Sequence, residues 1–479
     1  ITAAAERGSD MGLIDWARNL FGFGKLNNET TPAGTIEKEF GVQPAASRKM
    51  EDNINLWWAM YTNHPPWESC DVRPLGLPGA IGRELARHAL TEFYVSVSGS
   101  ARAEYINQQM QLASAKFGIN LELGLCLGGV CLKPYPDNGR VLVDAFTTKF
   151  TPTRFDGTGK AIGGVFESNP VRQGKDWFVK LEYHDFQMRE DGSTVYVVEN
   201  KAFRSGSSGG TGTPVPLASV KEWAGLVESS EIENLTGPLF SYFKPPSANN
   251  IEPASALGVS VYSGPTADLI RQADEQWQQL QREYKTGKRR MLIDKAVMDA
   301  SQADDEIYEY GVFSNKDFFQ FINPEIRDDP LYNGFQRILQ RIEFNVGLAF
   351  GTISDPQSVE KTATEILAAK QRQFVTEKAI QAAFQSTLDD LIYAMDAWCD
   401  LARLAPAGTY RVDYNWGDGV LDDPETKRQD KAMDMQLVDA GLMKPVAFVM
   451  KWEGVDEKTA RKMLPDLEDM TDEEQDEVE

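Results

Sequence analysis

The chain has 479 residues, 42% of them hydrophobic and 25% charged, which is typical of a globular protein with two or three domain cores. Its formal net charge of −23 argues against a protein that holds nucleic acid on a basic face. Four cysteines and three histidines in so long a chain predict neither a disulfide framework nor a zinc site.

The first 45 residues predict one helix and a linker. Residues 1–10 lack the apolar segment of a signal peptide, and Met11 is the expected start, so this decapeptide is a candidate non-native leader. Residues 11–21 repeat apolar side chains at helical spacing and predict a docked N-terminal helix. A linker rich in Gly, Asn, Thr and Pro completes the segment 11–45.

Residues 46–262 mix helical and strand patterns. The stretch LPGAIGRELARHALTEFYVSV begins as a helix and changes to strand-forming residues, and the apolar stretch GLCLGGVCL resembles a hairpin. Three stretches alternate apolar and polar side chains and predict antiparallel strands: RVLVDAFTTKFTPTRF, WFVKLEYHDFQ and STVYVVENKAFR. The alternation places His184 on the Lys180 side of its strand, which predicts that it faces solvent. The Gly/Ser-rich residues 204–214 predict a flexible loop.

Two helices with narrow apolar stripes come next, separated by residues 288–328. The first helix covers residues 263–287, with Pro265 in its first turn and Gly287 just past its end. The second covers residues 329–350. The stripes are Leu269, Ala273, Trp277, Leu280 and Tyr284 in the first helix, and Phe335, Ile338, Ile342, Val346 and Ala349 in the second.

A short polar stretch, residues 351–358, leads into a helical pattern over residues 359–405. At 1.5 Å per residue this helix would be roughly 65–70 Å long, so we expect a kink in a compact chain. Narrow stripes bury only one side of a helix, so the remaining contacts are expected from neighbouring copies. The pattern therefore predicts an assembled, ring-like protein of the α+β class.

The C-terminal part predicts a strand and then helices. Residues 406–430 contain the strand pattern TYRVDYNW and a connection. Residues 431–465 predict helices, with breaks at Gly441 and Pro445. The acidic residues 466–479 predict a disordered tail.

The candidate sites for chemistry are weak. Ser358 and Lys361 have the Ser-x-x-Lys spacing of some serine hydrolases, but no Ser-Asp-Asn follows. A Lys-Thr-Gly does occur, but it precedes the serine and begins at Lys285, where it is interpreted as a helix end. No phosphate-binding Gly-x4-Gly-Lys-Ser/Thr motif is present. We therefore expect no enzyme and no cofactor.

A metal site is not expected either. Asp418, Asp422 and Asp423 could hold a cation, although a solvated turn is the favoured interpretation.

Several stretches resemble the portal proteins of long-tailed double-stranded DNA bacteriophages. The strongest is NGFQRILQRIEFNVGLAFGTISDPQSVEKTATEILAAKQRQFVTEKAIQAAFQSTLDDLIYA, preceded by ALGVSVYSGPTADLIRQADEQWQQLQREYKTGKRRM and followed by DGVLDDPETKRQDKAMDMQLVDAGLMKPVAFVMKWEGVDEKTA. GGVCLKPY, KFTPTRFDGTGKAIGGVFE and WFVKLEYH also look like that family's α/β region. The likeness covers roughly residues 45–465 and rests on element order rather than on single diagnostic motifs.

The resemblance implies a ring, usually dodecameric, at one vertex of the capsid, made in the bacterial host cytoplasm and carried in the virion. Double-stranded DNA would pass weakly and non-specifically through its channel during packaging and ejection. Its partners would be terminase, head–tail connector proteins, and the major capsid and scaffold proteins, with no membrane. The implied parts are a wing (46–262), stem helices (263–287 and 329–350), an α/β clip (288–328), a tunnel loop (351–358), a tunnel/wing helix (359–405) and a crown (431–465).

The same resemblance assigns the site residues. The DNA-facing residues of the tunnel loop and of the helix start after it would be Thr352, Ser354, Asp355, Gln357, Ser358 and Lys361. From the residues themselves, Lys285, Lys288, Arg289 and Arg290 are the densest basic patch and could form a basic ring near the stem–clip junction, although a helix-dipole partner or a solubilising turn is the favoured interpretation. The clip would meet partners through Asp304, Asp305, Glu306 and Glu309.

Two alternatives remain open from the sequence. One is a minor capsid or head-morphogenesis protein without a channel. The other, more remote, is a serine hydrolase that uses Ser358 and Lys361.

Overall fold

The computed structural model describes residues 31–207, 211–287, 290–294, 308–311, 319–322, 325–356, 363–417, 424–453 and 457–464. The chain divides into two compact units, Ile1–Trp416 and Gly417–Glu479. Helices and mainly antiparallel sheets together give the expected α+β class. No helix among the described residues has both the length and the hydropathy of a membrane span.

Five helices lie between residues 31 and 127 of the described chain, and their ends follow from local sequence. They are α2 (Ala33–Phe40), α3 (Arg48–Tyr61), α4 (Leu77–Ala89), α5 (Ala101–Ser114) and α6 (Phe117–Leu127). Ser47 caps α3 by accepting the Met50 N–H at 3.3 Å, and Ser100 caps α5 by accepting the Ala103 N–H at 3.2 Å. The C-cap of α6 is Gly128, at φ +83°.

Three sheets belong to the α/β body. The largest has the order β10-β8-β7-β5-β4, and β6 and β9 pair at its sides; a second has the order β11-β2-β3, and β1 pairs with β15. The strands are β1 (Tyr94–Ser98), β2 (Val130–Asp137), β3 (Arg140–Phe146), β4 (Phe150–Phe155), β5 (Ala161–Glu167), β6 (Val171–Gln173), β7 (Asp176–Met188), β8 (Thr194–Ser205), β9 (Thr213–Val215), β10 (Ser229–Glu233), β11 (Ser241–Phe243) and β15 (Arg411–Asn415).

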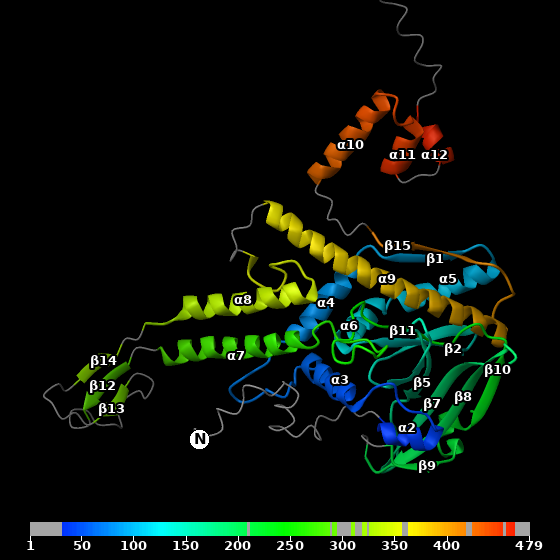
Figure 1. The fold of residues 1–479 in the computed structure, drawn as a ribbon, viewed down its shortest axis with the longest axis horizontal. Helices are drawn as coiled ribbons and strands as arrows, with labels where there is room; N and C mark the ends of the chain where they lie inside the picture. Colours follow the sequence, from blue (N-terminus) through cyan, green and yellow to red (C-terminus); the bar gives the residue numbers. More distant parts are fainter. Residues whose placement is uncertain are drawn as a thin grey trace, which may run out of the picture. The chain divides into compact units, whose positions relative to one another are not determined.

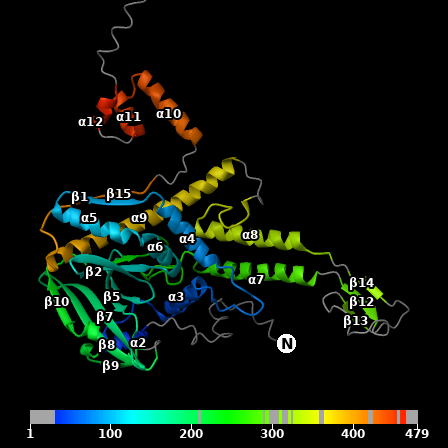
Figure 2. The same cartoon turned by 180° about the vertical axis from the view of Figure 1, so that it is seen from behind.

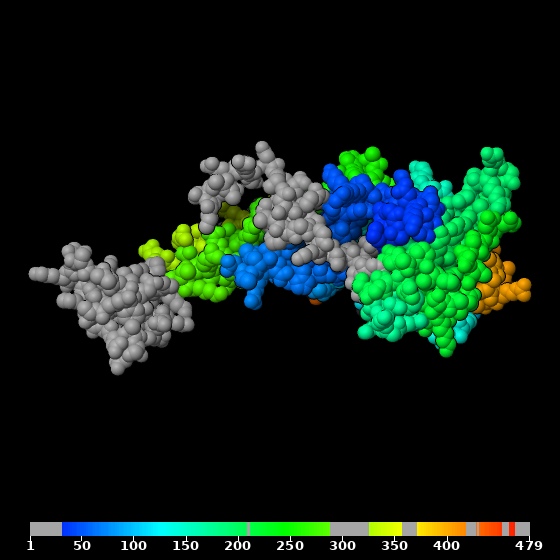
Figure 3. Space-filling model, turned by 90° about the horizontal axis from the view of Figure 1, so that it is seen from below, coloured from blue at the N-terminus to red at the C-terminus, as the bar shows by residue number. Residues whose placement is uncertain are grey.

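Helix α2 covers one face of the large sheet. Its Ile36 is 1% exposed and packs with Val165, Leu181 and Phe203. The blue surface of this N-terminal part lies against the green surface of the sheet in Figure 3. The segment 11–45 was predicted to end in a linker, so this prediction is wrong over Ala33–Phe40, because a single well-placed isoleucine buries the helix.

Helices α7 (Pro265–Thr286) and α8 (Asp328–Val346) lie side by side, as Figures 1 and 2 show from opposite directions. The centres of the Trp277 and Phe335 rings lie 5.3 Å apart, and the Gln276 side-chain amide donates to the Leu331 carbonyl at 3.2 Å. Between the two helices the chain forms a small sheet of β12 (Arg290–Asp294), β13 (Tyr308–Gly311) and β14 (Phe319–Ile322), in the order β13-β12-β14.

Helix α9 (Ala363–Leu401) is the centre of the main core. Its second half is buried against the β11-β2-β3 sheet and α4 and α5. The buried side chains include Ile380, Phe384, Leu388, Leu391, Ile392, Met395 and Cys399. The helix is one unbroken element of 39 residues, and its second half is accommodated within one copy of the chain.

The second unit contains α10 (Pro424–Asp439), α11 (Pro445–Glu453) and α12 (Glu457–Met463). The breaks at Gly441, where φ is +70°, and at Pro445 are confirmed. Helix α10 begins earlier than the predicted residue 431.

Three further local predictions are corrected. GLCLGGVCL is no hairpin, because α6 continues to Leu127 before β2 begins. The second striped helix ends at Val346 rather than at residue 350, because Gly347 adopts φ +80° and stops it. The loop 204–214 is not wholly unpacked, because Thr211 is buried and β9 begins at Thr213.

Candidate functional site

A tight turn follows α8, and we call residues 347–355 the Glu343 turn. Glu343 lies on α8 and is 0% exposed, although it is a glutamate. Its carboxylate accepts the N–H of Gly351 at 3.1 and 3.2 Å, that of Ile353 at 2.7 Å and that of Ser354 at 2.9 Å. The Ser354 hydroxyl adds a fourth donor at 2.8 Å. A buried carboxylate with four donors fixes the course of the turn, and the Gly351 N–H also donates to the Ser354 hydroxyl oxygen at 3.1 Å.

The turn is tied to its neighbours as well as to Glu343. Gln336 on α8 accepts the Asp355 N–H at 2.7 Å, and Gln373 on α9 accepts the Ala349 N–H at 3.3 Å. Gly351 adopts φ +89°, a conformation that favours glycine. The turn therefore joins α8 to the region of α9 through side chains from both helices.

The predicted tunnel-loop residues have different surroundings. Thr352 is half-buried, and its hydroxyl donates to the Ala349 carbonyl at 2.7 Å. Asp355 is half-buried and accepts the Tyr332 hydroxyl at 3.3 Å. Ser354 is only 6% exposed, so its prediction as a DNA-facing side chain is corrected: its hydroxyl points to Glu343 inside the chain. Gln357, Ser358 and Lys361 lie outside the described residues.

Two arginines beside the turn were missed by the sequence analysis. The guanidinium of Arg372 lies 4.5 Å from the centre of the Phe344 ring and 5.5 Å from that of Phe350. Arg341 lies 5.1 Å from the same Phe344 ring, which is 44% exposed. The i,i+3 spacing of Arg341 and Phe344 on α8 is the signal that could have indicated this contact. The described part of the turn thus has cationic neighbours from α8 and α9.

The predicted basic ring and clip surface are described only in part. Lys285 is exposed in the last turn of α7, near the ion pair of Arg327 with Glu283 at 3.0 Å. Arg290 begins β12, and Glu309 lies in β13 opposite Leu292. The other predicted residues lie outside the described ranges: Lys288, Arg289, Asp304, Asp305 and Glu306.

Glycine is favoured at position 287, the end of α7, because the surroundings leave no room for a side chain and not because the backbone is left-handed. The φ of Gly287 is −73°, and its N–H donates to the Glu283 carbonyl. A Cβ at this position would approach that oxygen and the Ile326 side chain to 2.9 Å each. The interpretation of Lys285-Thr286-Gly287 as a helix end is therefore confirmed.

His184 is buried, which corrects the prediction that it faces solvent. Its Nδ1 lies 2.6 Å from the Tyr196 hydroxyl and its Nε2 lies 2.6 Å from Glu182. Lys133 on β2 and Lys180 on β7 donate to the same glutamate at 2.7 and 2.6 Å. Lys133 of the sheet that contains β2 covers this side of β7. For this reason the polar side chains on this face of the strand do not face solvent.

Burial and charge act in opposite directions in this cluster. Burial lowers the pKa of His184 and outweighs the opposing effect of Glu182. Burial alone would raise the pKa of Glu182, but Lys133, His184 and Lys180 hold it well below its usual range. The cluster is therefore a buried ion pair network with a neutral imidazole.

Asp274 on α7 is a second buried acid, 1% exposed. It accepts the indole N–H of Trp67 at 2.8 Å and the Leu75 N–H at 2.9 Å. Burial raises the pKa of Asp274 to about 6, although both hydrogen bonds oppose the shift. This aspartate fixes the segment between α3 and α4 on the side of α7.

Among the described residues, no group of three or more His, Cys, Asp or Glu side chains is placed to hold a metal ion. Asp418, Asp422 and Asp423 lie outside them. All four cysteines are free, and Cys126, Cys131 and Cys399 are buried. Comparison of the chain with protein-family models and with curated protein sequences gives no match.

Proposed function

We propose that this chain is the subunit of a phage portal: a ring, dodecameric in our proposal, at one capsid vertex through which DNA is packaged and ejected. The observation that carries the proposal is the pair of helices α7 and α8, which lie antiparallel with a small sheet inserted between their ends. In the proposed ring these helices are the stem and the β12–β14 sheet belongs to the clip.

The surface of the helix pair supports assembly. Over its last ten residues α7 buries only Leu280, whereas Tyr284 remains 45% exposed. On α8, Phe344 is 44% exposed beside the Glu343 turn. Apolar side chains left uncovered in one copy are available to neighbouring copies, and such contacts hold a ring together.

The Glu343 turn supports a role for a shaped polar segment in the channel. It precedes the predicted DNA-facing residues Gln357, Ser358 and Lys361, and it is held by buried side chains rather than left loose. Short polar groups bind phosphates singly and weakly, which suits DNA that must slide. Twelve copies at −23 each carry −276, and this charge opposes tight binding of DNA.

The partners of the proposed ring are terminase during packaging, head–tail connector proteins afterwards, and the capsid and scaffold proteins around it. The clip is the proposed docking surface for the first two. Hydrolysis of ATP is assigned to the terminase, since the sequence has no phosphate-binding loop.

The first experiment measures the mass and shape of the purified protein by light scattering and negative-stain microscopy. A monomer is 53.4 kDa, so a dodecamer is about 640 kDa. Rings with a central hole support the portal. Closed particles without a hole, or a protein that stays at 53.4 kDa across concentration and salt and with its scaffold, favour a head-morphogenesis protein without a channel.

A second experiment tests the role of the loop. Deletion of Gln357 and Ser358 is expected to impair DNA packaging or retention and to leave rings intact. Loss of the rings would instead make the loop an assembly element and contradict its proposed place in the channel.

A further inference from the structure

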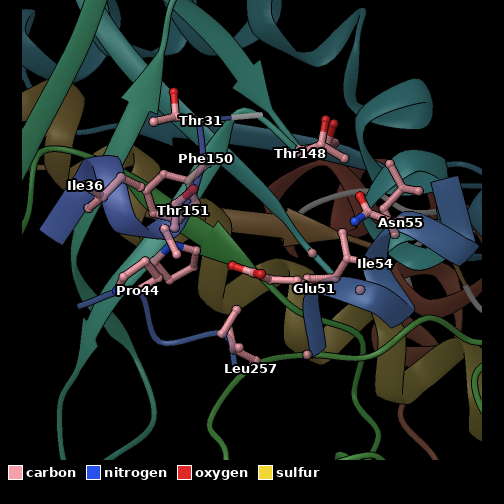
Figure 4. A pocket seen from close by; sticks show the side chains of 18 of the residues that line it. Thr31, Ile36, Pro44, Glu51, Ile54, Asn55, Thr148, Phe150, Thr151 and Leu257 are labelled. Carbon is pink, nitrogen blue, oxygen red and sulfur yellow. The ribbon is translucent and has the colours of Figure 1, made fainter. Parts of the chain in front are cut away.

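A cavity of about 240 Å³ lies between the N-terminal helices and the α/β body, away from the Glu343 turn. Helix α3 contributes Glu51, Ile54 and Asn55, while Phe150 and Thr151 enter from β4, as Figure 4 shows. The remaining lining residues come from the α2 region, the α2–α3 connection, the β3–β4 connection, β4, β11 and the segments around residues 128 and 257.

Backbone packing builds the floor of this cavity. Gly128, Gly129 and Gly258 line it, and a Cβ on Gly258 would lie 2.2 Å from the Gly128 carbonyl oxygen. Two chain segments distant in sequence can meet this closely only because both are glycine here. The cavity is therefore a consequence of the main fold and not of one mobile side chain.

Glu51 is the only charged residue among those that line the cavity. Its side chain extends from α3 into the space between Pro44, Phe150 and Leu257 (Figure 4). Within the described part of the chain, this carboxylate forms no hydrogen bond and no ion pair. Burial raises the pKa of Glu51, and nearby Asp52 adds to this effect while Arg48 opposes it. The carboxylate thus faces the cavity with only partial compensation, from Arg48, and burial dominates.

The other polar groups of the cavity are suited to accept hydrogen bonds. Thr148 and Thr151 offer hydroxyl oxygens and Asn55 offers an amide oxygen. An ammonium group has three donors and no acceptor, so one carboxylate and two such oxygens would satisfy it. The apolar walls, with Ile36 and Leu257, suit a short alkyl chain attached to the ammonium.

The size of the cavity limits the ligand. Its 240 Å³ lies below the roughly 300–1,000 Å³ of pockets that take drug-sized molecules. An anion would be repelled by Glu51, and a neutral group would leave the carboxylate uncompensated. We propose that this cavity binds the ammonium end of a small alkylamine, either a free amine or the side chain of a lysine from a second copy of the chain. This inference does not depend on the proposed function.

The test is calorimetric titration of the full chain with n-propylammonium chloride, with 1-propanol and sodium chloride as ligand controls. We expect saturable binding of the amine and none of 1-propanol. In E51Q the affinity should fall at least about tenfold, since a hydrogen bond to a charged group is lost. E104Q makes the same chemical change at an exposed site on α5 and should bind as the unaltered chain does.

Light scattering during the titration separates the two sources. Binding at constant mass assigns the cavity to a free amine, whereas binding that dissociates copies assigns it to a lysine of a second copy. Thermal unfolding of E51Q checks that the variant folds. Absence of saturable binding to the unaltered chain, or equal binding by a folded E51Q, overturns the proposal.

Discussion

Glu343 offers the sharpest test of how the turn after α8 is held. Replacement by alanine removes the acceptor of four donors, the N–H groups of Gly351, Ile353 and Ser354 and the Ser354 hydroxyl. Each unsatisfied buried donor costs about 1–3 kcal/mol. Removal of the carboxylate also ends its own desolvation penalty, several kcal/mol for a buried ion. The net loss of unfolding free energy in E343A is therefore expected to be about 3–5 kcal/mol, the range for a broken buried network.

E343Q should lose less, about 2–3 kcal/mol, because the amide keeps one acceptor oxygen and turns a donor toward the other N–H groups. The matched control is R337A, a truncation at an exposed position of α8, expected within about 0.5 kcal/mol of the unaltered chain.

Urea unfolding gives the free energies, and amide hydrogen exchange locates the effect. Protection at Gly351, Ile353 and Ser354 should fall in E343A far more than protection in α5, which is remote from the turn in sequence. Unchanged exchange at these three amides, or a loss below 1 kcal/mol, would refute the reasoning that the carboxylate holds the turn.

Three other changes test separate parts of the structure. Folded Asp274 keeps its proton up to about pH 6, whereas an unfolded aspartate releases it near pH 4. The free energy of unfolding should therefore fall by up to about 3 kcal/mol as the pH rises through this window, and D274N should lack this component. A stability difference between the two proteins that stays flat from about pH 4 to about pH 6.5 would contradict this. Arg102 is 2% exposed and donates to Asp396, to Asp400 and to the carbonyls of residues 396, 405 and 406. In urea unfolding, R102A should lose about 3–5 kcal/mol of unfolding free energy and R102K clearly less. Equal losses would mean that the planar guanidinium is not required. A Cβ at Gly258 would meet backbone, whereas Gly118 has open space around it. G258A should therefore lower the unfolding free energy by about 1–3 kcal/mol or more, and G118A should stay within about 1 kcal/mol of the unaltered chain. Similar melting temperatures for the two variants would count against the close packing.

The elements that sequence patterns predicted best are those with punctuated ends or long periodicity. Pro265 and Gly287 bound α7 closely, and the alternating strands are present as β3, β4, β7 and β8. Local rules are sufficient in these places because the chain itself supplies the cap, the turn or the buried face.

The predictions failed where a distant segment decides the environment. His184 was assigned to solvent because Lys180 shares its face, yet Lys133 from another sheet covers that face. Ser354 was assigned to the channel through the resemblance, yet one acid on α8 turns its hydroxyl inward. The same acid was invisible in the pattern, since a glutamate at a buried helical position looks like an ordinary solvated one.

The long helix was misjudged for a related reason. The remaining contacts of the helices were expected from neighbouring copies, whereas the buried face of this helix, which includes Leu391, Ile392, Ala394 and Met395, is covered within one copy of the chain. Periodicity reports the preferred face of a helix but not how many elements enclose it.

The uneven burial of α9 has a mechanical consequence. The helix is about 60 Å long over its 39 residues. The C-terminal part of the helix, from Ile380 onward, is clamped by the core and by Arg102. Among residues 371–379, only the Glu377 side chain is buried. Residues 371–379 contact the Glu343 turn through Gln373 and Arg372, so this less buried stretch connects the turn to the clamped part of the helix as a compliant segment. Force applied near the Glu343 turn would therefore be absorbed around residues 371–379, and the body would remain still.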